Sequence, residues 1–224
     1  MSEASQRLHA YVDANVLIEF RQLDSIPWRE VLGRTDAVLV ISRVAFDELD
    51  KFKDAPGPPR KKRQRAAKTA KWLSGLLFGN GAERPVRIQE GLYVDYDDAP
   101  LPADIWTLPG IEPLDPVLND HRQVAHLLLA RKRKPEHEIT FVTHDCGAGR
   151  AAAFRGLPTI NMPEDHKVAD EPDPEQKELL GLRKRLAELE SRAPKLVVRC
   201  CGHDSSHPHT IPLPQDIDDL TQHL

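Results

Sequence analysis

Four acidic residues lie where short apolar runs end or where helical stretches begin. Asp13 and Asp145 each close a short apolar run that is typical of a buried strand. Glu48 lies within a stretch of helical spacing, and Asp120 opens another. Carboxylates gathered at the carboxyl ends of parallel strands repel one another unless a cation neutralises them. Because hard oxygen ligands suit Mg²⁺ or Mn²⁺, we expect a metal-dependent enzyme that acts on phosphate esters.

The elements that must position these acids alternate along the chain. Apolar runs predict strands at residues 10–13, 37–41, 86–88, 92–94, 138–143 and 157–160. Helical spacing predicts helices at residues 14–23, 28–32, 43–53, 60–77, 120–130 and 147–154, with Ser42 as a helix N-cap. This alternation indicates an α/β sandwich around a largely parallel sheet. Capping remains an alternative role for Asp120, since Asp is common at helix starts.

A basic segment follows the stretch that contains Glu48. It holds seven cations and no acid: Arg60, Lys61, Lys62, Arg63, Arg65, Lys68 and Lys71. Positive charge at a helix N-terminus opposes the helix macrodipole, so this charge serves something other than helix stability. A groove for a phosphate backbone is one interpretation, and a solvated surface helix is the other.

Composition narrows the class of protein. With 224 residues, 40% of them hydrophobic, the chain can bury a real core. The net charge of −4 argues against a uniformly basic coat but allows a local basic patch. The odd count of three cysteines, two of them adjacent, does not fit a disulfide framework. We therefore expect a cytoplasmic protein, and no apolar run is long enough for a membrane span.

The composition changes after residue 163. We expect residues 164–224 to comprise an acidic, Pro-containing linker, an amphipathic helix at 176–192, a strand at 195–199 and a Cys/His-containing tail. Leucines at alternating steps of three and four form a short coiled-coil seam in this helix: Leu179, Leu182, Leu186 and Leu189. Docking on the domain, homodimerisation and binding of a partner helix all remain open. The tail lacks a Cys-x-x-Cys pair, so zinc is a weak alternative there.

Taken in order, these motifs resemble the PIN-domain nucleases. The segment 11–18 is similar to the first-strand motif of that family, and 44–53 is similar to the second motif, with its acid just before Leu49. The segments 119–123 and 142–145 resemble the third and fourth motifs. The basic helix also resembles that of PIN domains found with PhoH-type ATPases, although this chain lacks a Gly-x-x-x-x-Gly-Lys-Ser/Thr loop. The resemblance covers residues 9–163.

The resemblance implies a Rossmann-like α/β/α fold, with a C-terminal extension beyond it, and a Mg²⁺- or Mn²⁺-dependent site. Its catalytic and metal-binding residues would be Asp13, Glu48, Asp120 and Asp145. Asn15 and Thr143 would support them by hydrogen-bonding ligands or the scissile phosphate. The phosphate backbone would lie on the basic segment through Arg60, Lys61, Lys62, Arg63, Arg65 and Lys68.

The leading hypothesis is therefore a metal-dependent endoribonuclease acting on single-stranded RNA. A structure-specific DNA nuclease is an alternative, although the sequence shows no clear helix–hairpin–helix module. A non-catalytic nucleic-acid-binding or scaffold domain is a second alternative. Such domains usually lose one or more of the acids, and here all four are present.

Overall fold

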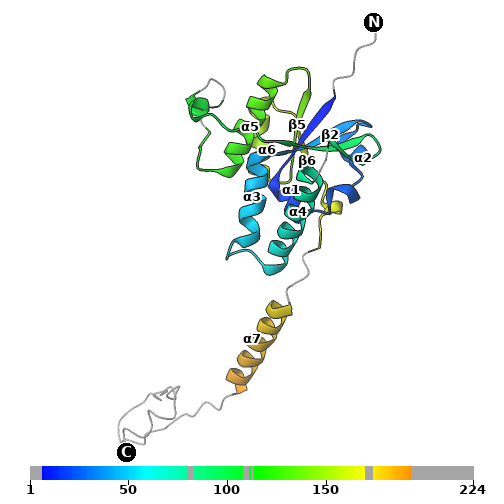
Figure 1. Ribbon diagram of the computed structural model, residues 1–224. Coiled ribbons are helices and arrows are strands. Elements are labelled where there is room, and N and C mark those ends of the chain that lie inside the picture. The colour runs from blue at the N-terminus through cyan, green and yellow to red at the C-terminus, as the bar shows by residue number, and fades with distance from the viewer. Residues whose placement is uncertain (1–6, 80–82, 108–110, 112–113, 170–173, 193–224) are drawn as a thin grey trace, which may run out of the picture. The chain divides into compact units, whose positions relative to one another are not determined.

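The computed structural model describes residues 7–79, 83–107, 111, 114–169 and 174–192 (Figure 1). The chain divides into two compact units, residues 1–171 and residues 172–224. The first unit contains the sheet and its helices. It thus extends past residue 163, where the sequence resemblance ends.

Within the described residues, six strands form one mixed sheet in the order β3-β4-β2-β1-β5-β6. The strands are β1 (Leu8–Val12), β2 (Ala37–Ser42), β3 (Val86–Gln89), β4 (Leu92–Asp97), β5 (Glu138–Thr143) and β6 (Thr159–Asn161). Every neighbouring pair is parallel except the edge pair β3–β4. The chain builds outward from β1 to β2 and β4, and then crosses back to place β5 on the other side of β1. The switch point between β1 and β5 is where such folds place their ligands.

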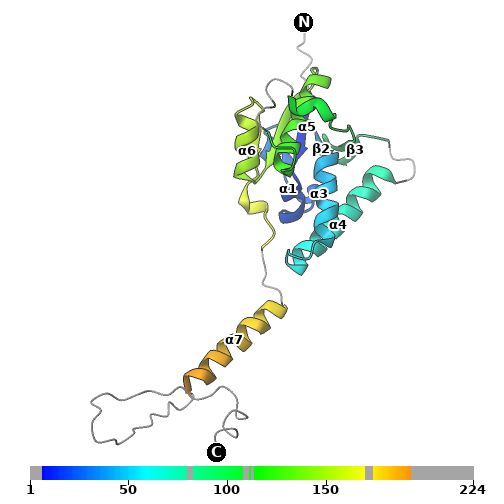
Figure 2. The same ribbon diagram turned by 90° about the vertical axis from the view of Figure 1, so that its left-hand side faces the viewer.

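Helices cover both faces of this sheet, which confirms the predicted α/β sandwich (Figures 1 and 2). They are α1 (Ala14–Glu19), α2 (Trp28–Leu32), α3 (Arg43–Asp54), α4 (Arg60–Phe78), α5 (Asn119–Arg133) and α6 (Cys146–Ala153). Alternation along β1 creates two cores, because successive side chains point to opposite faces. Leu8, Ala10 and Val12 pack with α1 to α4, whereas Tyr11 packs with α5 and α6.

The first helix is much shorter than the predicted 14–23. It ends at Glu19, and Phe20 is extended and forms an antiparallel bridge with Lys167. The Arg21 amide donates to the carbonyl of His166 at 3.0 Å. A 3₁₀ turn follows at Leu23–Ser25. Long-range pairing with the segment after β6 therefore overrides the local helical pattern.

Several other element boundaries also differ from the sequence prediction. β6 occupies Thr159–Asn161 rather than 157–160, and α5 begins at Asn119 with Leu118 as its N-cap. Asp120 thus lies inside the first turn of α5 and does not cap it. Short 3₁₀ turns occur at Ala103–Thr107 and Glu164–His166.

The second unit is described only through α7 (Pro174–Arg192), which corresponds to the predicted amphipathic helix. The strand predicted at 195–199 and the Cys/His tail lie outside the described residues. In the part of the chain that is described, no helix has the length and apolar character needed to cross a membrane.

Candidate active site

The carboxylate of Asp13 is almost completely buried at the end of β1. Asp13 is 4% exposed, and its amide donates to the Val142 carbonyl at 2.9 Å, which extends the β1–β5 pairing by one step. Its backbone occupies the N-cap position of α1, but its side chain makes no capping hydrogen bond. The Asp13 carboxylate therefore does not cap the start of α1, which leaves it available for chemistry.

Thr143 joins Asp13 to Asp145. Its hydroxyl donates to Asp13 Oδ2 at 2.7 Å and accepts from the Asp145 amide at 3.0 Å. Thr143 is 2% exposed and lies at the end of β5, directly beside β1 in the sheet. Because its single hydroxyl proton goes to Asp13, Thr143 fixes the orientation of that carboxylate.

Asp145 has a capping role in addition to its place in the cluster. Its Oδ1 accepts from the amides of Gly147 at 2.5 Å and Ala148 at 3.2 Å, at the start of α6. A β-carbon at position 147 would lie 3.0 Å from Asp145 Oδ1 and 4.0 Å from Asp120 Oδ2. Glycine at this position therefore keeps open the space between the two carboxylates. Sequence reasoning missed this role of Gly147.

Glu48 projects from α3 and completes the cluster. Its carboxylate is half-buried and is hydrogen-bonded by the side chain of Asn119, the first residue of α5. Asn119 had been part of a motif without an assigned role. Asn15 is half-buried in the first turn of α1.

The pKa values of these acids show that their charges interact. Burial, followed by the nearby charges of Asp120 and Asp145, raises the pKa of Asp13 to about 6, although the Thr143 hydrogen bond opposes the rise. Burial, Asp13 and Asp120 raise the pKa of Glu48 to about 7, against the Asn119 hydrogen bond. Burial and Asp145 also raise the pKa of Asp120. Successive acids of this set are 25 to 72 residues apart in the sequence. The fold brings them together at the carboxyl ends of the strands, where they share one electrostatic environment.

The donor set fits a hard divalent cation. All four side chains offer carboxylate oxygens, the ligands that Mg²⁺ and Mn²⁺ prefer, and Gly147 leaves room between two of them. Across the described residues, no three acidic, histidine or cysteine side chains already form a group that could enclose a metal ion. The carboxylates therefore interact through their charges without enclosing a metal ion. A bound cation would have to draw them closer together.

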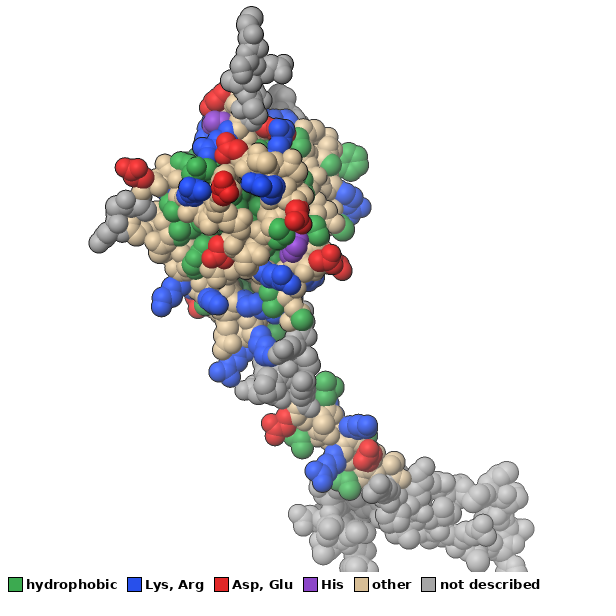
Figure 3. All heavy atoms as spheres, turned by 90° about the vertical axis from the view of Figure 1, so that its right-hand side faces the viewer, with side chains coloured by type: hydrophobic (Ala, Val, Ile, Leu, Met, Phe, Trp, Pro, Cys, Tyr) green, Lys and Arg blue, Asp and Glu red, His purple; other side chains and the backbone are tan. Residues whose placement is uncertain are grey.

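The cations of α4 differ in how far they are exposed. Arg60 and Lys68 are exposed, whereas Lys61, Arg63 and Arg65 are half-buried. Lys62 Nζ lies 2.6 Å from Glu19 Oε1, and so part of the basic charge neutralises an acid of the same domain. Lys and Arg side chains gather at the lower end of the domain in Figure 3, at the level where α4 begins in Figure 1. The basic residues of α4 are therefore divided between exposed and half-buried positions, and their use as a phosphate-binding surface stays a prediction.

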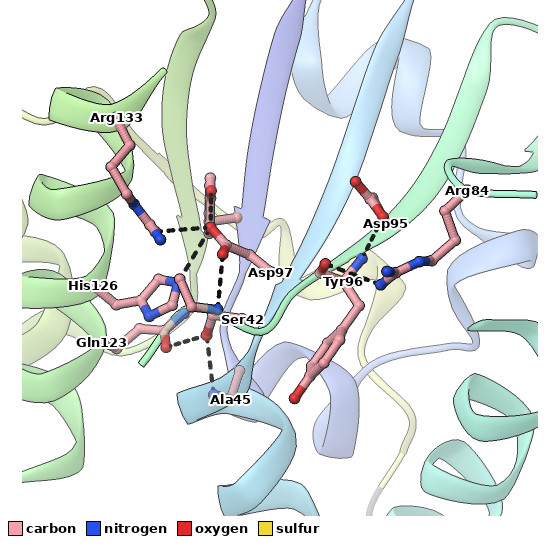
Figure 4. Close-up of polar contacts among 11 residues, drawn as sticks. Ser42, Ala45, Arg84, Asp95, Tyr96, Asp97, Gln123, His126 and Arg133 are labelled. Carbon is pink, nitrogen blue, oxygen red and sulfur yellow. Dashed lines mark hydrogen bonds and ion pairs between the residues drawn. The ribbon is translucent and has the colours of Figure 1, made fainter. Parts of the chain in front are cut away.

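A fifth acid at the same sheet edge was missed by sequence reasoning. Asp97 ends β4 and is 7% exposed, and its Oδ2 accepts from Tyr11 Oη at 2.7 Å and Arg133 at 3.2 Å (Figure 4). His126 Nε2 lies 3.3 Å from the same oxygen. Although burial opposes it, these contacts hold the pKa of Asp97 well below its ordinary range. Asp97 is thus a charged structural anchor of α5, unlike Asp13, Glu48 and Asp120, whose pKa values are raised.

One family model matches most of the chain. The family model described as "PIN domain" matches residues 11–163. No curated protein matches the sequence. Among solved structures, a domain of a functionally unknown protein from Methanocaldococcus jannaschii is similar at 15% identity, with a TM-score of 0.42. That match covers 74% of this chain and 96% of the other.

Proposed function

The chain belongs to the PIN-domain family, and from that premise we propose that it is a metal-dependent endoribonuclease that hydrolyses single-stranded RNA. PIN domains have a nuclease-type fold and typically use divalent metal ions. The observation that carries the proposal is the Thr143 hydroxyl, which ties Asp13 to the strand end that presents Asp145. A purely structural acid pair would gain nothing from being held side by side with like charge.

The proposed roles follow from burial and position. Asp13, Asp120 and Asp145 would bind the cation directly or through water, while Glu48 would bind a second cation or orient the attacking water. Thr143 holds Asp13 in place, and Asn15 would support a ligand or the scissile phosphate. A bound Mg²⁺ or Mn²⁺ would supply an activated water and neutralise charge on the phosphoryl oxygens.

The reaction is a hydrolysis at phosphorus. The oxygen of water forms a new P–O bond, the bond to one ribose oxygen breaks, and that oxygen leaves with a proton. Raised pKa values mean that, in the absence of a cation, Asp13 and Glu48 stay partly protonated at higher pH than ordinary carboxyls, Glu48 as far as neutral pH. When a cation replaces those protons, it neutralises the repulsion among the carboxylates. This behaviour fits a site whose charge is balanced by its ligand.

We place the RNA backbone on the start of α4. Arg60 and Lys68 are the exposed cations of the predicted set, so they are the first residues to contact phosphates. Lys61, Arg63 and Arg65 are half-buried and would contribute through their field, and Lys62 is shared with Glu19.

The test compares cleavage of a labelled single-stranded RNA and a matched DNA, with Mg²⁺, with Mn²⁺ and with EDTA. Asp13→Asn and Asp145→Asn should abolish metal-dependent RNA cleavage. Asp104→Asn, which removes one exposed carboxylate elsewhere, is the matched control and should retain it. Cleavage of DNA alone would favour the structure-specific DNA nuclease. Absence of both cleavage and metal binding would leave a non-catalytic nucleic-acid-binding or scaffold domain.

A further inference from the structure

A pocket that contains two arginines lies beside the acid cluster. It has a volume of about 250 Å³ and is lined by Arg43 and Asp47 of α3, by Pro100 and Leu101 after β4, and by Arg122 of α5. That volume is below the roughly 300–1,000 Å³ typical of drug-sized ligand sites, so it suits one phosphate and part of a nucleoside.

Both guanidinium groups retain donors for a ligand. Arg43 lies 3.9 Å from Asp47, and the two side chains are 54% and 46% exposed, so this pair is weak. Arg122 Nη1 lies 3.5 Å from Asn119 Oδ1, which is at the long limit for a hydrogen bond. A guanidinium carries five N–H donors in a planar fork that matches a phosphate. Arg43 and Arg122 can therefore grip an anion without breaking a strong internal contact.

Buried polar contacts fix the segments that form the walls of the pocket (Figure 4). The Ser42 hydroxyl donates to Gln123 Oε1 at 2.6 Å and accepts from the Ala45 amide at 3.1 Å, which links the start of α3 to α5. Asp97 Oδ1 accepts from the Ala99 amide at 3.2 Å and so fixes the start of the loop that contributes Pro100. The three walls are thus preorganised, which reduces the entropic cost of binding.

The pocket is continuous with the acid cluster through Asn119. The Asn119 side chain contacts Arg122 on one side and the Glu48 carboxylate on the other. Along α3, the pocket residue Val44 precedes Glu48 by one helical turn, about 6 Å of rise. This separation is on the scale of one nucleotide along a strand.

We propose that this pocket binds the nucleotide next to the scissile phosphodiester. Arg43 and Arg122 hold its phosphate, and Pro100 and Leu101 provide an apolar wall for its ribose or base. The inference rests on the proposed nuclease function and adds a subsite to it. It also implies that binding of the RNA does not depend on α4 alone.

The test measures binding of a labelled single-stranded RNA oligonucleotide in EDTA, and hydrolysis of oligonucleotide and bis(p-nitrophenyl) phosphate with Mn²⁺. Arg43→Gln and Arg122→Gln should each weaken oligonucleotide binding roughly tenfold, as expected for loss of a charged hydrogen bond. Hydrolysis of the small diester, which has no neighbouring nucleotide, should be unchanged. Arg29→Gln removes an exposed charge on α2 and should have no effect on either substrate.

Three results would overturn the inference in different ways. If wild-type protein binds and cleaves the oligonucleotide and both pocket variants behave like Arg29→Gln, the subsite is wrong and the nuclease function stands. If wild-type protein neither binds nor cleaves any nucleic acid, the proposed function fails and the subsite fails with it. A loss of small-diester hydrolysis in the pocket variants would show that they disturb the acid cluster instead.

A separate observation concerns α7. Leu182, Leu186 and Leu189 are 57%, 57% and 62% exposed and, with Leu179, occupy heptad positions a and d. The flanking g positions are then Glu178 and Arg185, and the flanking e positions are Arg183 and Glu190. In a parallel pair, each g residue faces the e residue five positions later in the second copy. Glu178 would face Arg183, and Arg185 would face Glu190, so every such contact is attractive.

The antiparallel alternative is disfavoured by the same residues. With the leucine layers kept in register, Arg183 would face Arg183 and Arg185 would face Arg185 of the second copy, which is repulsive. We infer that α7 pairs weakly with α7 of a second copy in parallel orientation. Its two heptads are too short for strong association.

Sedimentation equilibrium of the full chain over a wide concentration range tests this pairing. Leu182→Lys should abolish self-association, whereas Leu180→Lys, at the outward-facing b position, should not. Glu178→Arg alone should weaken association, and adding Arg183→Glu should restore it. A monomer at every concentration, or a double charge swap that restores nothing, would overturn the parallel dimer.

Discussion

Replacing Asp13 with Asn should stabilise the metal-free protein, and the gain should grow as the pH rises. Burial, together with the charges of Asp120 and Asp145, raises the pKa of Asp13 from its ordinary 3.8 to about 6. The folded protein therefore holds this proton at pH values where the unfolded chain has released it. Because the folded-state pKa is the higher one, the stability contributed by the protonated carboxyl is lost as the pH rises from about 4 through 6.

The magnitude follows from the shift. A rise of about 2 pKa units corresponds to about 3 kcal/mol of unfolding free energy, and about 2 kcal/mol of that falls between about pH 4.5 and pH 8. The amide oxygen of the substituted side chain can still accept the Thr143 hydroxyl, so the main change is the loss of charge. Glu48 adds to the effect, since the Asp13 charge helps to raise its pKa.

Urea unfolding in EDTA, followed by the fluorescence of the buried Trp28, measures this difference directly. The unfolding free energy of Asp13→Asn minus that of wild type should increase by about 2 kcal/mol from about pH 4.5 to pH 8. Asp104→Asn should follow wild type at every pH. Parallel pH profiles for wild type and Asp13→Asn would refute the reasoning, because they would mean that Asp13 ionises normally in the folded protein.

Three further substitutions probe the supports of the site. Gly147→Ala should lower Mn²⁺ affinity roughly tenfold in a calorimetric titration, since its methyl group would press on Asp145 Oδ1, while the melting temperature stays within a few degrees. Thr143→Val should cost about 1–3 kcal/mol of unfolding free energy at neutral pH, measured by urea titration, because it removes the hydroxyl that donates to Asp13 and accepts from the Asp145 amide. Asp97→Ala should cost roughly 3 kcal/mol in the same assay through loss of a buried ionic anchor, and a cost below about 1 kcal/mol would contradict that role.

The sequence predicted which acids lie at the carboxyl ends of the strands because the apolar runs end sharply there. Asp13 and Asp145 follow strands that are buried throughout or nearly so, and parallel pairing of β1 with β5 brings their ends together. Periodicity was sufficient for this, since each strand carries its own signal in a few consecutive residues.

Features that depend on distant partners were not visible in the sequence. Phe20 looked helical, yet its pairing with Lys167 ends α1 early. The strand predicted at 92–94 continues to Asp97, whose partners Tyr11 and Arg133 are 86 and 36 residues away. The space beside Gly147 likewise exists only once α5 and α6 are packed together. In each case, tertiary contact outweighs the local pattern.

The most direct measurement is calorimetric titration of Mn²⁺ into the full chain near pH 6.5, in two buffers of different ionisation enthalpy. If Asp13, Glu48, Asp120 and Asp145 form one cation site, binding should saturate and release protons, because the pKa values of Asp13 and Glu48 leave both carboxyls partly protonated there. Asp120→Asn and Asp145→Asn should each weaken this binding strongly, and Asp104→Asn should not. Absence of saturable binding, or equal binding by wild type and both cluster variants, would contradict a metal-dependent active site at this sheet edge.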